Sequence, residues 1–500
     1  MSTISGVDPR TGTPLAPVAE DTSAAAVARH AAAAAACPVP GREFRAAFLD
    51  RIADEAERSR AELVAIAMRE TGFADAKLQG ELTRAAFQFR FFADVVREGS
   101  YLEATVDPAA DTPMGPRPDL RRILVPLGPV AVFGASNFPF AFSVLGGDTA
   151  SALAAGNPVI LKAHPSHPGT SLLSYEVLRR AVTATGAPDA TVGLVFGTEA
   201  GAALVAQPEI KAVGFTGSLS GGRALLDVIA GRAEPIPFYG ELASLNPIAV
   251  TPAAAAERAE EIGRGLVASI TVGAGQLCTK PGVVLVPAGD AGDRLVAAAR
   301  TAIGEVPGQV LLNERIFRSY TEETERYGSD GGIREAVGNS AEGGFGVAAQ
   351  LFETTVAGLA QHPVQEIFGP VTVIARYDAA NVTGEVARAL ASLGNSLTAT
   401  LHTGSEESAL AAELTAAVQP YAGRIVYDGF PTGVAVSWAQ HHGGPWPSTN
   451  SIHTSVGATA IRRFLRPVTY QNAPESVLPE ELRDEYRGIP RRIDGVLRSA

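Results

Sequence analysis

The chain has 500 residues, of which 46% are hydrophobic and 19% are charged, and this is enough apolar material for two or three domains. Its 53 acidic and 41 basic side chains give a formal net charge of -12, and the basic residues form no runs. Neither nucleic acid nor an anionic membrane is therefore expected as a partner. Cys37 and Cys278 are the only cysteines, which favours free thiols in a reducing compartment over a disulfide framework.

Two further features bear on where the protein works. The N-terminus, MSTISGVDPRTG, lacks the basic and apolar regions of a secretory signal. No uninterrupted apolar stretch reaches the roughly 20 residues that a membrane-spanning helix needs. We therefore expect a cytoplasmic protein without a membrane partner.

The first hundred residues have helical character. Residues 22–36 are rich in alanine, and apolar residues recur at helical spacing over 43–70 and 79–98. Gly72 and Gly80 are expected to mark breaks near the second of these stretches. The sequence thus predicts an all-helical N-terminal layer.

Short runs rich in Val, Ile and Phe then alternate with helix-length segments, which is typical of a parallel sheet covered on both faces. The expected strands cover 123–133, 158–162, 192–196, 212–216 and 247–251. The expected helices cover 141–155, 168–184, 198–206 and 220–231. This alternation predicts an α/β fold with a doubly wound, nucleotide-binding domain.

A second alternating series starts after about residue 252 and predicts a second α/β domain. Its expected helices cover 256–272 and 292–302, and its expected strands cover 282–286 and 371–376. The glycine- and serine-rich stretch 328–346 is predicted to be a loop. A strand at 465–471 would have to pair with another strand, and such an edge often joins a second subunit.

Cys278 is the first candidate for chemistry. It lies in the glycine-rich turn GAGQLCT (273–279), where the backbone can approach a ligand closely. A lone cysteine is more often a small buried hydrophobe, but the loop context favours a nucleophile. Asn137 in GASNFPF (134–140) follows a predicted strand, so its amide would lie at the carboxyl end of the sheet, unless it is a turn residue or helix cap.

Other motifs carry weaker signals. The turn FTGS (215–218) precedes a predicted helix, where backbone N–H groups suit a phosphate, although the strict GxGxxG pattern is absent. Glu241 and Glu366 are carboxylates set among glycine and apolar residues, where a raised pKa would suit a general base. Lys162, one of four lysines, ends a predicted strand at the place of a cofactor ribose.

In this order, the motifs resemble those of the aldehyde dehydrogenase superfamily over about residues 5–490. The shared motifs are SNFP (136–139), LK (161–162), FTGS (215–218), GEL (240–242), GQLC (275–278) and EIFGP (366–370). The resemblance implies a Rossmann-type cofactor domain, an α/β catalytic domain and a β arm that builds a homodimer or homotetramer. The expected ranges are 1–114 and 131–251 for the cofactor domain, 252–445 for the catalytic domain, 115–130 and 465–490 for the arm, and 446–464 for a return segment.

The resemblance also implies roles for single residues. Cys278 would form a thioester with the aldehyde carbon, the Asn137 amide and the Cys278 backbone N–H would stabilise the oxyanion, and Glu241 would activate water. No metal is expected. The residues expected at the cofactor are Ser136, Lys162, Pro165, Gly217, Ser218, Gly222, Glu366 and Phe368.

The segment KAHPSHP (162–168) departs from the usual NAD-preferring pattern, in which a glutamate three residues after the lysine takes both ribose hydroxyls. Pro165 stands at that place, so no carboxylate would repel a 2'-phosphate. This favours NADP slightly and leaves NAD admissible. No arginine near this segment in the sequence is an obvious partner for the phosphate.

Within the superfamily, the chain resembles α-ketoglutaric semialdehyde (2,5-dioxopentanoate) dehydrogenases and NADP-dependent fatty aldehyde dehydrogenases. The shared stretches are 125–130, 167–171, 236–242 and 442–445. The expected reaction is oxidation of 2,5-dioxopentanoate to 2-oxoglutarate. The alternatives are oxidation of a medium- or long-chain fatty aldehyde and CoA-acylating semialdehyde dehydrogenation, and Glu241 as a water-activating base argues against the second.

A dioxo acid carries a carboxylate that would need a cationic partner. Arg84 lies on a helix that resembles one lining the substrate tunnel, so it is expected to bind this carboxylate. The alternative for Arg84 is a surface pair with Glu81. Phe138 and His442 are expected to shape the pocket.

Overall fold

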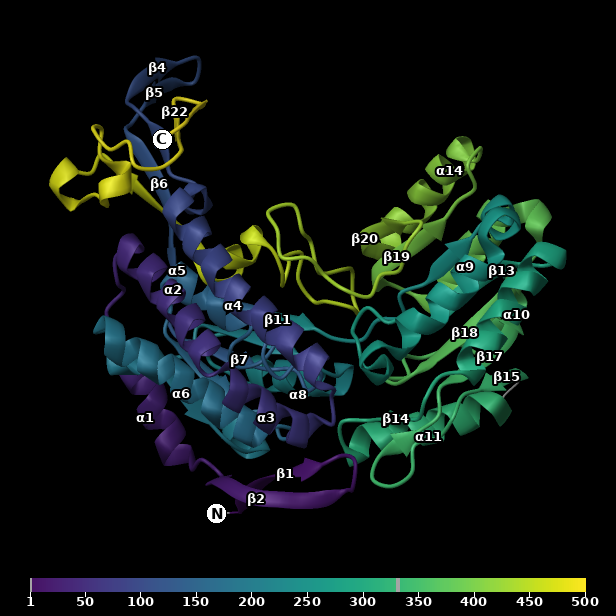
Figure 1. The fold of residues 1–500 in the computed structure, drawn as a ribbon. Coiled ribbons are helices and arrows are strands. Elements are labelled where there is room, and N and C mark those ends of the chain that lie inside the picture. The colour runs from purple at the N-terminus through teal and green to yellow at the C-terminus, as the bar shows by residue number, and fades with distance from the viewer. Residues whose placement is uncertain (1, 330–332) are drawn as a thin grey trace.

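The computed structural model describes residues 2–329 and 333–500 and contains three main sheets (Figure 1). The first sheet has five parallel strands in the order β11-β10-β7-β8-β9. Its strands are β7 (Val130–Phe133), β8 (Val159–Lys162), β9 (Val192–Val195), β10 (Ala212–Thr216) and β11 (Phe238–Glu241). The chain starts at β7, adds β8 and β9 on one side and then returns to add β10 and β11 on the other. Ligands bind at such a switch point in doubly wound sheets.

Helices cover both faces of this sheet, because neighbouring residues of each strand point to opposite sides. Val130 and Val132 of β7 pack in one core with α2, α4, α5 and α6, while Ala131 and Phe133 pack in another core with α1, α7 and α8. The helices are α1 (Ala24–Ala35), α2 (Arg42–Arg58), α3 (Arg60–Thr71), α4 (Asp75–Glu98), α5 (Gly147–Ala155), α6 (Pro168–Thr185), α7 (Thr198–Ala206) and α8 (Leu219–Ala230).

The N-terminal layer differs from the prediction at two points. A β-hairpin of β1 (Thr3–Asp8) and β2 (Thr13–Glu20) precedes the helices. Gly72 ends α3 with a φ of 69°, whereas Gly80 lies inside α4 and does not break it. Gly80 is tolerated there because the apolar face of α4 is buried, and this packing outweighs the weak helix propensity of one glycine.

The second sheet has seven strands in the order β15-β17-β18-β13-β12-β19-β20, and only β15 runs antiparallel to its neighbour. The strands are β12 (Ile248–Val250), β13 (Val283–Pro287), β15 (Ile333–Val337), β17 (Gln350–Thr355), β18 (Val371–Tyr377), β19 (Ser396–His402) and β20 (Ala422–Tyr427). The helices around it are α9 (Pro252–Thr271), α10 (Asp290–Gly304), α11 (Glu314–Ser329), α12 (Val356–Gln361), α13 (Val382–Leu393) and α14 (Ser408–Val418). A short pair, β14 (Gln309–Val310) and β16 (Gly346–Val347), lies beside it.

Two expectations change in this region. The strand predicted at 247–251 in the first series is β12, and it pairs with β13 and β19 in the middle of the second sheet. The predicted loop 328–346 contains β15, which forms an edge of that sheet through backbone pairing with β17 rather than through an apolar pattern of its own. Residues 330–332 of that stretch lie outside the described residues.

The third sheet projects from the body of the molecule as an arm (Figure 1). Its order is β21-β6-β3-β22-β23, and a small hairpin of β4 and β5 lies near its tip. Its strands are β3 (Thr105–Asp107), β6 (Leu120–Pro126), β21 (Leu465–Gln471), β22 (Arg491–Ile493) and β23 (Val496–Arg498), and the hairpin is β4 (Ala110–Thr112) with β5 (Gly115–Arg117). The predicted strand 465–471 thus pairs with β6 of the same chain and forms an edge of the arm.

The single strand expected at 123–133 is divided between two sheets. β6 ends at Pro126 in the arm, and β7 begins at Val130 in the first sheet. Gly128 between them has a φ of 120°, a conformation that allows the chain to change direction. None of the helices in the described ranges is both long and apolar enough to cross a membrane.

A buried ion pair ties the C-terminal segment to the first domain and gives a test of the fold. Arg463, whose side chain is 2% exposed, pairs with Asp148 at 2.6 Å. Arg463→Ala leaves Asp148 uncompensated, so we expect the free energy of unfolding to fall by about 3 kcal/mol or more in urea denaturation. The neighbouring Arg462 is 45% exposed and pairs with Glu103, so Arg462→Ala should cost less than about 1 kcal/mol. Equal losses in both variants would contradict this account.

Candidate active site

Cys278 lies in a tight loop that follows α9, at the junction of the first and second sheets. The backbone makes a turn over η3 (Val272–Gly275), in which Ala274 and Gly275 have positive φ values of 57° and 67°. A Cβ atom on Gly275 would lie 2.3 Å from the backbone of Gly369, so only glycine lets the two loops pack this closely. The half-buried Cys278 is thereby held against the loop that carries Glu366.

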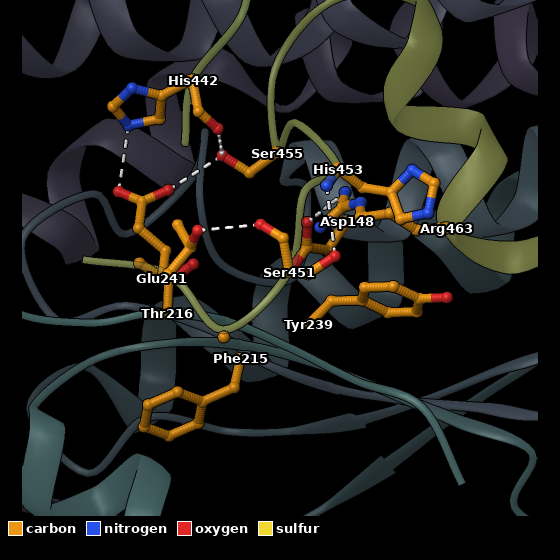
Figure 2. A pocket seen from close by; sticks show the side chains of 12 residues that line it. Asp148, Phe215, Thr216, Tyr239, Glu241, His442, Ser451, His453, Ser455 and Arg463 are labelled. Atoms are coloured by element: carbon orange, nitrogen blue, oxygen red, sulfur yellow. Dashed lines mark hydrogen bonds and ion pairs between the residues drawn. The ribbon is translucent and has the colours of Figure 1, made fainter. Parts of the chain in front are cut away.

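Glu241 and His442 complete a cluster around this thiol. His442 Nε2 lies 3.5 Å from Cys278 Sγ and 3.0 Å from Glu241 Oε1. The imidazole nitrogen, the sulfur and the carboxylate oxygen all lie within 4.8 Å of one another. The hydroxyl of Ser455 donates to the other Glu241 oxygen at 2.8 Å. Figure 2 shows the Glu241 carboxylate between His442 and Ser455, at the wall of a small cavity. His442 thus contacts both candidate catalytic residues, which goes beyond the pocket-shaping role predicted for it.

Local structure holds Glu241 and His442 in place. Glu241 ends β11, where the Leu242 N–H donates to the Ser448 carbonyl at 2.8 Å and the Gly240 N–H donates to the Asn450 side chain at 2.7 Å. The His442 backbone N–H donates to the Thr454 hydroxyl at 2.7 Å. The segment between 442 and 455 therefore forms a frame that presses the imidazole against the carboxylate.

The charges in this cluster favour an ionised Glu241 beside a protonated Cys278. Burial alone would raise the pKa of Glu241, but His442 and the hydrogen bonds from His442, Ser455 and Cys278 outweigh it and hold this pKa below its usual value. Burial, followed by the neighbouring Glu241 charge, raises the pKa of the Cys278 thiol well above its usual value. The site thus favours a protonated thiol within 4.8 Å of an ionised carboxylate.

Asn137 lies in a loop that packs onto the Cys278 loop. Its buried side-chain amide donates to the Gln276 carbonyl at 2.7 Å. Glu81 of α4 accepts hydrogen bonds from the N–H groups of Phe140 and Ala141, and Lys77 donates to both Glu81 and the Asn137 carbonyl. The sequence analysis did not predict this network. The side-chain amide of Asn137 has two hydrogens, and its bond to Gln276 uses one of them.

The candidate cofactor residues gather at the carboxyl ends of β7, β8 and β10. Lys162 ends β8, and within the described part of the chain its ammonium group has no hydrogen-bond or ion-pair partner. Burial lowers the pKa of Lys162 to about 8. A buried, unpartnered ammonium suits the hydroxyl groups of a ribose, so this observation fits a nucleotide cofactor. Pro165, three residues on, is exposed and Ser136 is half-buried.

Helix capping and close packing explain part of the sequence of the glycine turn after β10. Ser218 caps α8 by accepting from the Gly221 N–H at 3.2 Å. A Cβ atom on Gly222 would lie 2.4 Å from the Leu242 side chain, and one on Gly217 would lie 2.8 Å from the Phe215 ring. The absence of side chains at Gly217 and Gly222 therefore serves the close packing of α8 against the strand ends.

Glu366 and Phe368 lie in a loop that a buried lysine fixes in place. Lys280, two residues after Cys278, donates to the carbonyl groups of Ile367 at 3.0 Å and Val371 at 2.8 Å. Burial raises the pKa of Glu366, and burial lowers the pKa of Lys280. Lys280 was not among the predicted site residues, although its place beside Cys278 in a chain with four lysines was a usable signal.

Arg84 is partly buried near the Cys278 cluster and does not pair with Glu81. Its guanidinium donates to the Val434 carbonyl and lies 5.4 Å from the centre of the Phe142 ring, which neighbours both Phe138 and His442. Its Nε and Nη2 atoms are buried and have no partner among the described residues. The surface-pair alternative for Arg84 is therefore wrong, because Glu81 bonds to Lys77 and to the Asn137 loop.

A second arginine, Arg424 of β20, reaches the same loop from the other side. It donates to the carbonyl groups of Pro431 and, at 2.9 Å, of Gly433. Gly433 precedes Val434, whose carbonyl group accepts from Arg84. Its buried Nε has no partner among the described residues. Nothing in the sequence around Arg424 indicated this role, since only the fold of the loop brings the two arginines together.

Comparison with known sequences identifies the class of protein. The aldehyde dehydrogenase family model matches residues 1–444. The chain is 44% identical to alpha-ketoglutaric semialdehyde dehydrogenase 2 of Azospirillum brasilense, over 99% of this chain and 96% of that protein. It is 40% identical to alpha-ketoglutaric semialdehyde dehydrogenase of Acinetobacter baylyi, over 91% and 88% of the two chains. The protein belongs to the aldehyde dehydrogenase family, whose members use NAD(P).

Solved structures agree with this assignment. An aldehyde dehydrogenase variant of Pseudomonas syringae, in complex with NAD+ and octanal, has a TM-score of 0.79 and 24% identity and covers 95% of this chain and 94% of its own. A proline utilization A variant of Bradyrhizobium japonicum has a TM-score of 0.77 and 26% identity over 90% of this chain and 45% of its own. The predicted α/β aldehyde dehydrogenase fold is thus confirmed.

The raised pKa of Cys278 leads to a pH-dependent prediction. The thiolate is the reactive form, so alkylation of Cys278 by iodoacetamide should accelerate roughly tenfold per pH unit between pH 7 and 9. Peptide mass spectrometry measures the labelling in a Cys37→Ser background, which removes the only other thiol. Glu241→Gln should accelerate labelling at pH 8, because the neighbouring charge no longer opposes the thiolate. A rate that is already constant from pH 7 would contradict the assignment.

Proposed function

We propose that this aldehyde dehydrogenase oxidises 2,5-dioxopentanoate to 2-oxoglutarate through a thioester on Cys278. The observation that carries the chemistry is the contact of the Cys278 thiol with His442 and the buried Glu241. The substrate is supported by the 44% identity, over almost the whole chain, to a protein named for this semialdehyde. It is further supported by two arginines with buried, unpartnered N–H groups beside the cluster.

The first step needs a proton acceptor for the thiol. The Glu241 carboxylate lies within 4.8 Å of the Cys278 sulfur, so the proton moves to this carboxylate as the sulfur attacks the aldehyde carbon. His442 is a positioning residue at this step, since it bonds to Glu241 and fixes the carboxylate beside the sulfur. The carbonyl double bond opens and leaves an alkoxide.

The Asn137 amide and the Cys278 backbone N–H are proposed to stabilise that alkoxide, and a donor of this kind is typically worth about 3 kcal/mol of barrier. The nicotinamide cofactor, when bound, supplies the acceptor for the hydride that leaves the same carbon. A thioester then remains on Cys278. Glu241 first releases the thiol proton to solvent and is ionised again. It then takes a proton from a water molecule that attacks the thioester, and this proton passes to the sulfur as the acid leaves.

Arg84 and Arg424 are proposed to bind the carboxylate end of the substrate. Both side chains hold the loop of residues 431–434, and both retain buried N–H groups without partners in the described chain. An arginine N–H left unpaired in a buried site costs free energy, which a carboxylate oxygen would recover. A neutral fatty aldehyde offers no such partner, so the fatty aldehyde alternative is disfavoured.

We further propose that Lys162 holds the adenosine ribose and Glu366 the nicotinamide ribose, with Ser136, Pro165, Gly217, Ser218, Gly222 and Phe368 around the rest of the cofactor. Pro165 places no carboxylate beside Lys162, which favours NADP slightly over NAD.

The edge strand β21 of the projecting arm supports a homodimer or homotetramer in which the arm contacts another subunit.

Two substitutions separate the steps of the reaction. Cys278→Ala should abolish aldehyde oxidation and leave cofactor binding unchanged, because only the nucleophile is lost. Glu241→Gln should lower kcat by ~10²-fold, and at high pH, where the thiol ionises without this carboxylate, it should accumulate an acyl-enzyme, since a glutamine cannot activate water. Intact-mass spectrometry of the quenched enzyme detects the acyl group. Steady turnover of Cys278→Ala would remove the proposed mechanism.

Substrate recognition is tested by Arg84→Met. The loss of a charged hydrogen bond of about 2 kcal/mol should lower kcat/KM for 2,5-dioxopentanoate by roughly 30-fold. The value for hexanal should stay within about twofold. Arg90→Met, on the same helix and paired with Asp54, is the matched control. The kinetics with 2,5-dioxopentanoate and with hexanal are measured with NADP and with NAD, each with and without CoA. An unchanged preference in Arg84→Met, or product formation that requires CoA, would argue against this function.

A further inference from the structure

Arg315 joins the two domains beside the proposed cofactor site. It lies in the first turn of α11, which packs beside the second sheet, and its Nη2 donates to the Ser218 hydroxyl at 3.0 Å. Ser218 caps α8 of the first domain at the place proposed for the cofactor. The two residues are 97 positions apart, and this contact exists only because α11 faces the start of α8.

The surroundings of Arg315 are positive. Arg315 and Lys162 both contribute, after burial and the neighbouring His167, to lowering the pKa of His164, which places Arg315 near the loop after β8. Asn313, two residues before Arg315, donates to the Ser166 hydroxyl of that loop at 2.8 Å. The start of α11 therefore contacts both of the loops that line the proposed cofactor site.

The guanidinium of Arg315 is not neutralised. Within the described residues Arg315 has no carboxylate partner and bonds only to the Ser218 hydroxyl. Arg318, one turn further on, is paired with Glu314 on the same exposed face of α11. A hydroxyl is a weak partner for a guanidinium, whereas a phosphate binds it through two charge-assisted hydrogen bonds.

We infer that Arg315 binds a phosphate group of the nicotinamide dinucleotide and thereby draws α11 onto the cofactor. The inference rests on the proposed cofactor site, where Ser218 lies near the phosphates. The phosphate is either the pyrophosphate or the 2'-phosphate of NADP, and both would exchange the Ser218 hydroxyl for phosphate oxygens on the same guanidinium. In the case of the 2'-phosphate, Arg315 is the cation that the sequence near Pro165 lacks.

Isothermal titration calorimetry with the apoenzyme tests this inference without turnover. The probes are NADP+, NAD+, ADP, which has the diphosphate only, and 2',5'-ADP, which adds the 2'-phosphate and lacks the diphosphate. Arg315→Ala should raise the Kd of NADP+ at least tenfold, and Arg315→Lys should give an intermediate value. Arg318→Ala, which removes the same charge from the same helix, should leave the Kd within about twofold. Thermal melting curves check that each variant is folded.

The pattern across the probes identifies the phosphate. Weaker binding of NADP+, NAD+ and ADP, with 2',5'-ADP the least affected, assigns Arg315 to the pyrophosphate. Weaker binding of NADP+ and 2',5'-ADP alone assigns it to the 2'-phosphate. Unchanged affinities in Arg315→Ala, or equal losses in Arg318→Ala, would overturn the inference. A wild-type enzyme that binds neither dinucleotide would instead overturn the proposed cofactor site.

Discussion

The contact between a buried carboxylate and a thiol is the constraint on which the rest of the site depends. Glu241 is almost fully buried, and an isolated carboxylate in such a place would take up a proton and lose its value as a base. His442 and Ser455 bond to its two oxygens and keep it ionised. The same charge favours the protonated form of Cys278, so the proposed proton acceptor and the proposed nucleophile lie within 4.8 Å of each other.

Loops from different sheets must meet within hydrogen-bond distance for this arrangement to hold. The Asn137 loop is tied to the Cys278 loop through Gln276, and Lys280 ties the Cys278 loop to the loop of Glu366. A buried amide and a buried ammonium group make these bonds to backbone carbonyl groups, and each bond fixes the position of one loop relative to the next. The positions of the reacting atoms are therefore set before any ligand binds, which limits the reorganisation that catalysis requires.

Two kinds of contact lie near the junction of the two domains: close backbone packing and hydrogen bonds between polar side chains. Gly275 allows two backbone segments of the second domain to touch, whereas Arg315 and Asn313 bridge the two domains through polar side chains at the proposed cofactor site. Close backbone packing is rigid, while a single arginine on a hydroxyl can exchange its partner. A rigid catalytic loop beside an exchangeable contact suits an enzyme that must admit and release a large cofactor.

Much of the molecule was predictable from local patterns. The alternation of apolar runs and helical segments predicted the first sheet and most of the helices, because period and composition are local properties. The motif order around Asn137, Glu241 and Cys278 indicated the family. The division of 123–133 between two sheets, the β15 strand and the place of β12 were missed, since pairing partners decide them.

The sequence by itself determined the fold class and the protein family and singled out Cys278 as the candidate nucleophile, because these follow from residue types in a fixed order. Only the tertiary structure decided that His442 contacts both Cys278 and Glu241. It also decided that Arg84 bonds to the same loop as Arg424 instead of pairing with Glu81. The contact of Arg315 with Ser218 is a third example. These contacts join residues up to 350 positions apart. Their energies depend on burial and distance, which no spacing along the chain encodes.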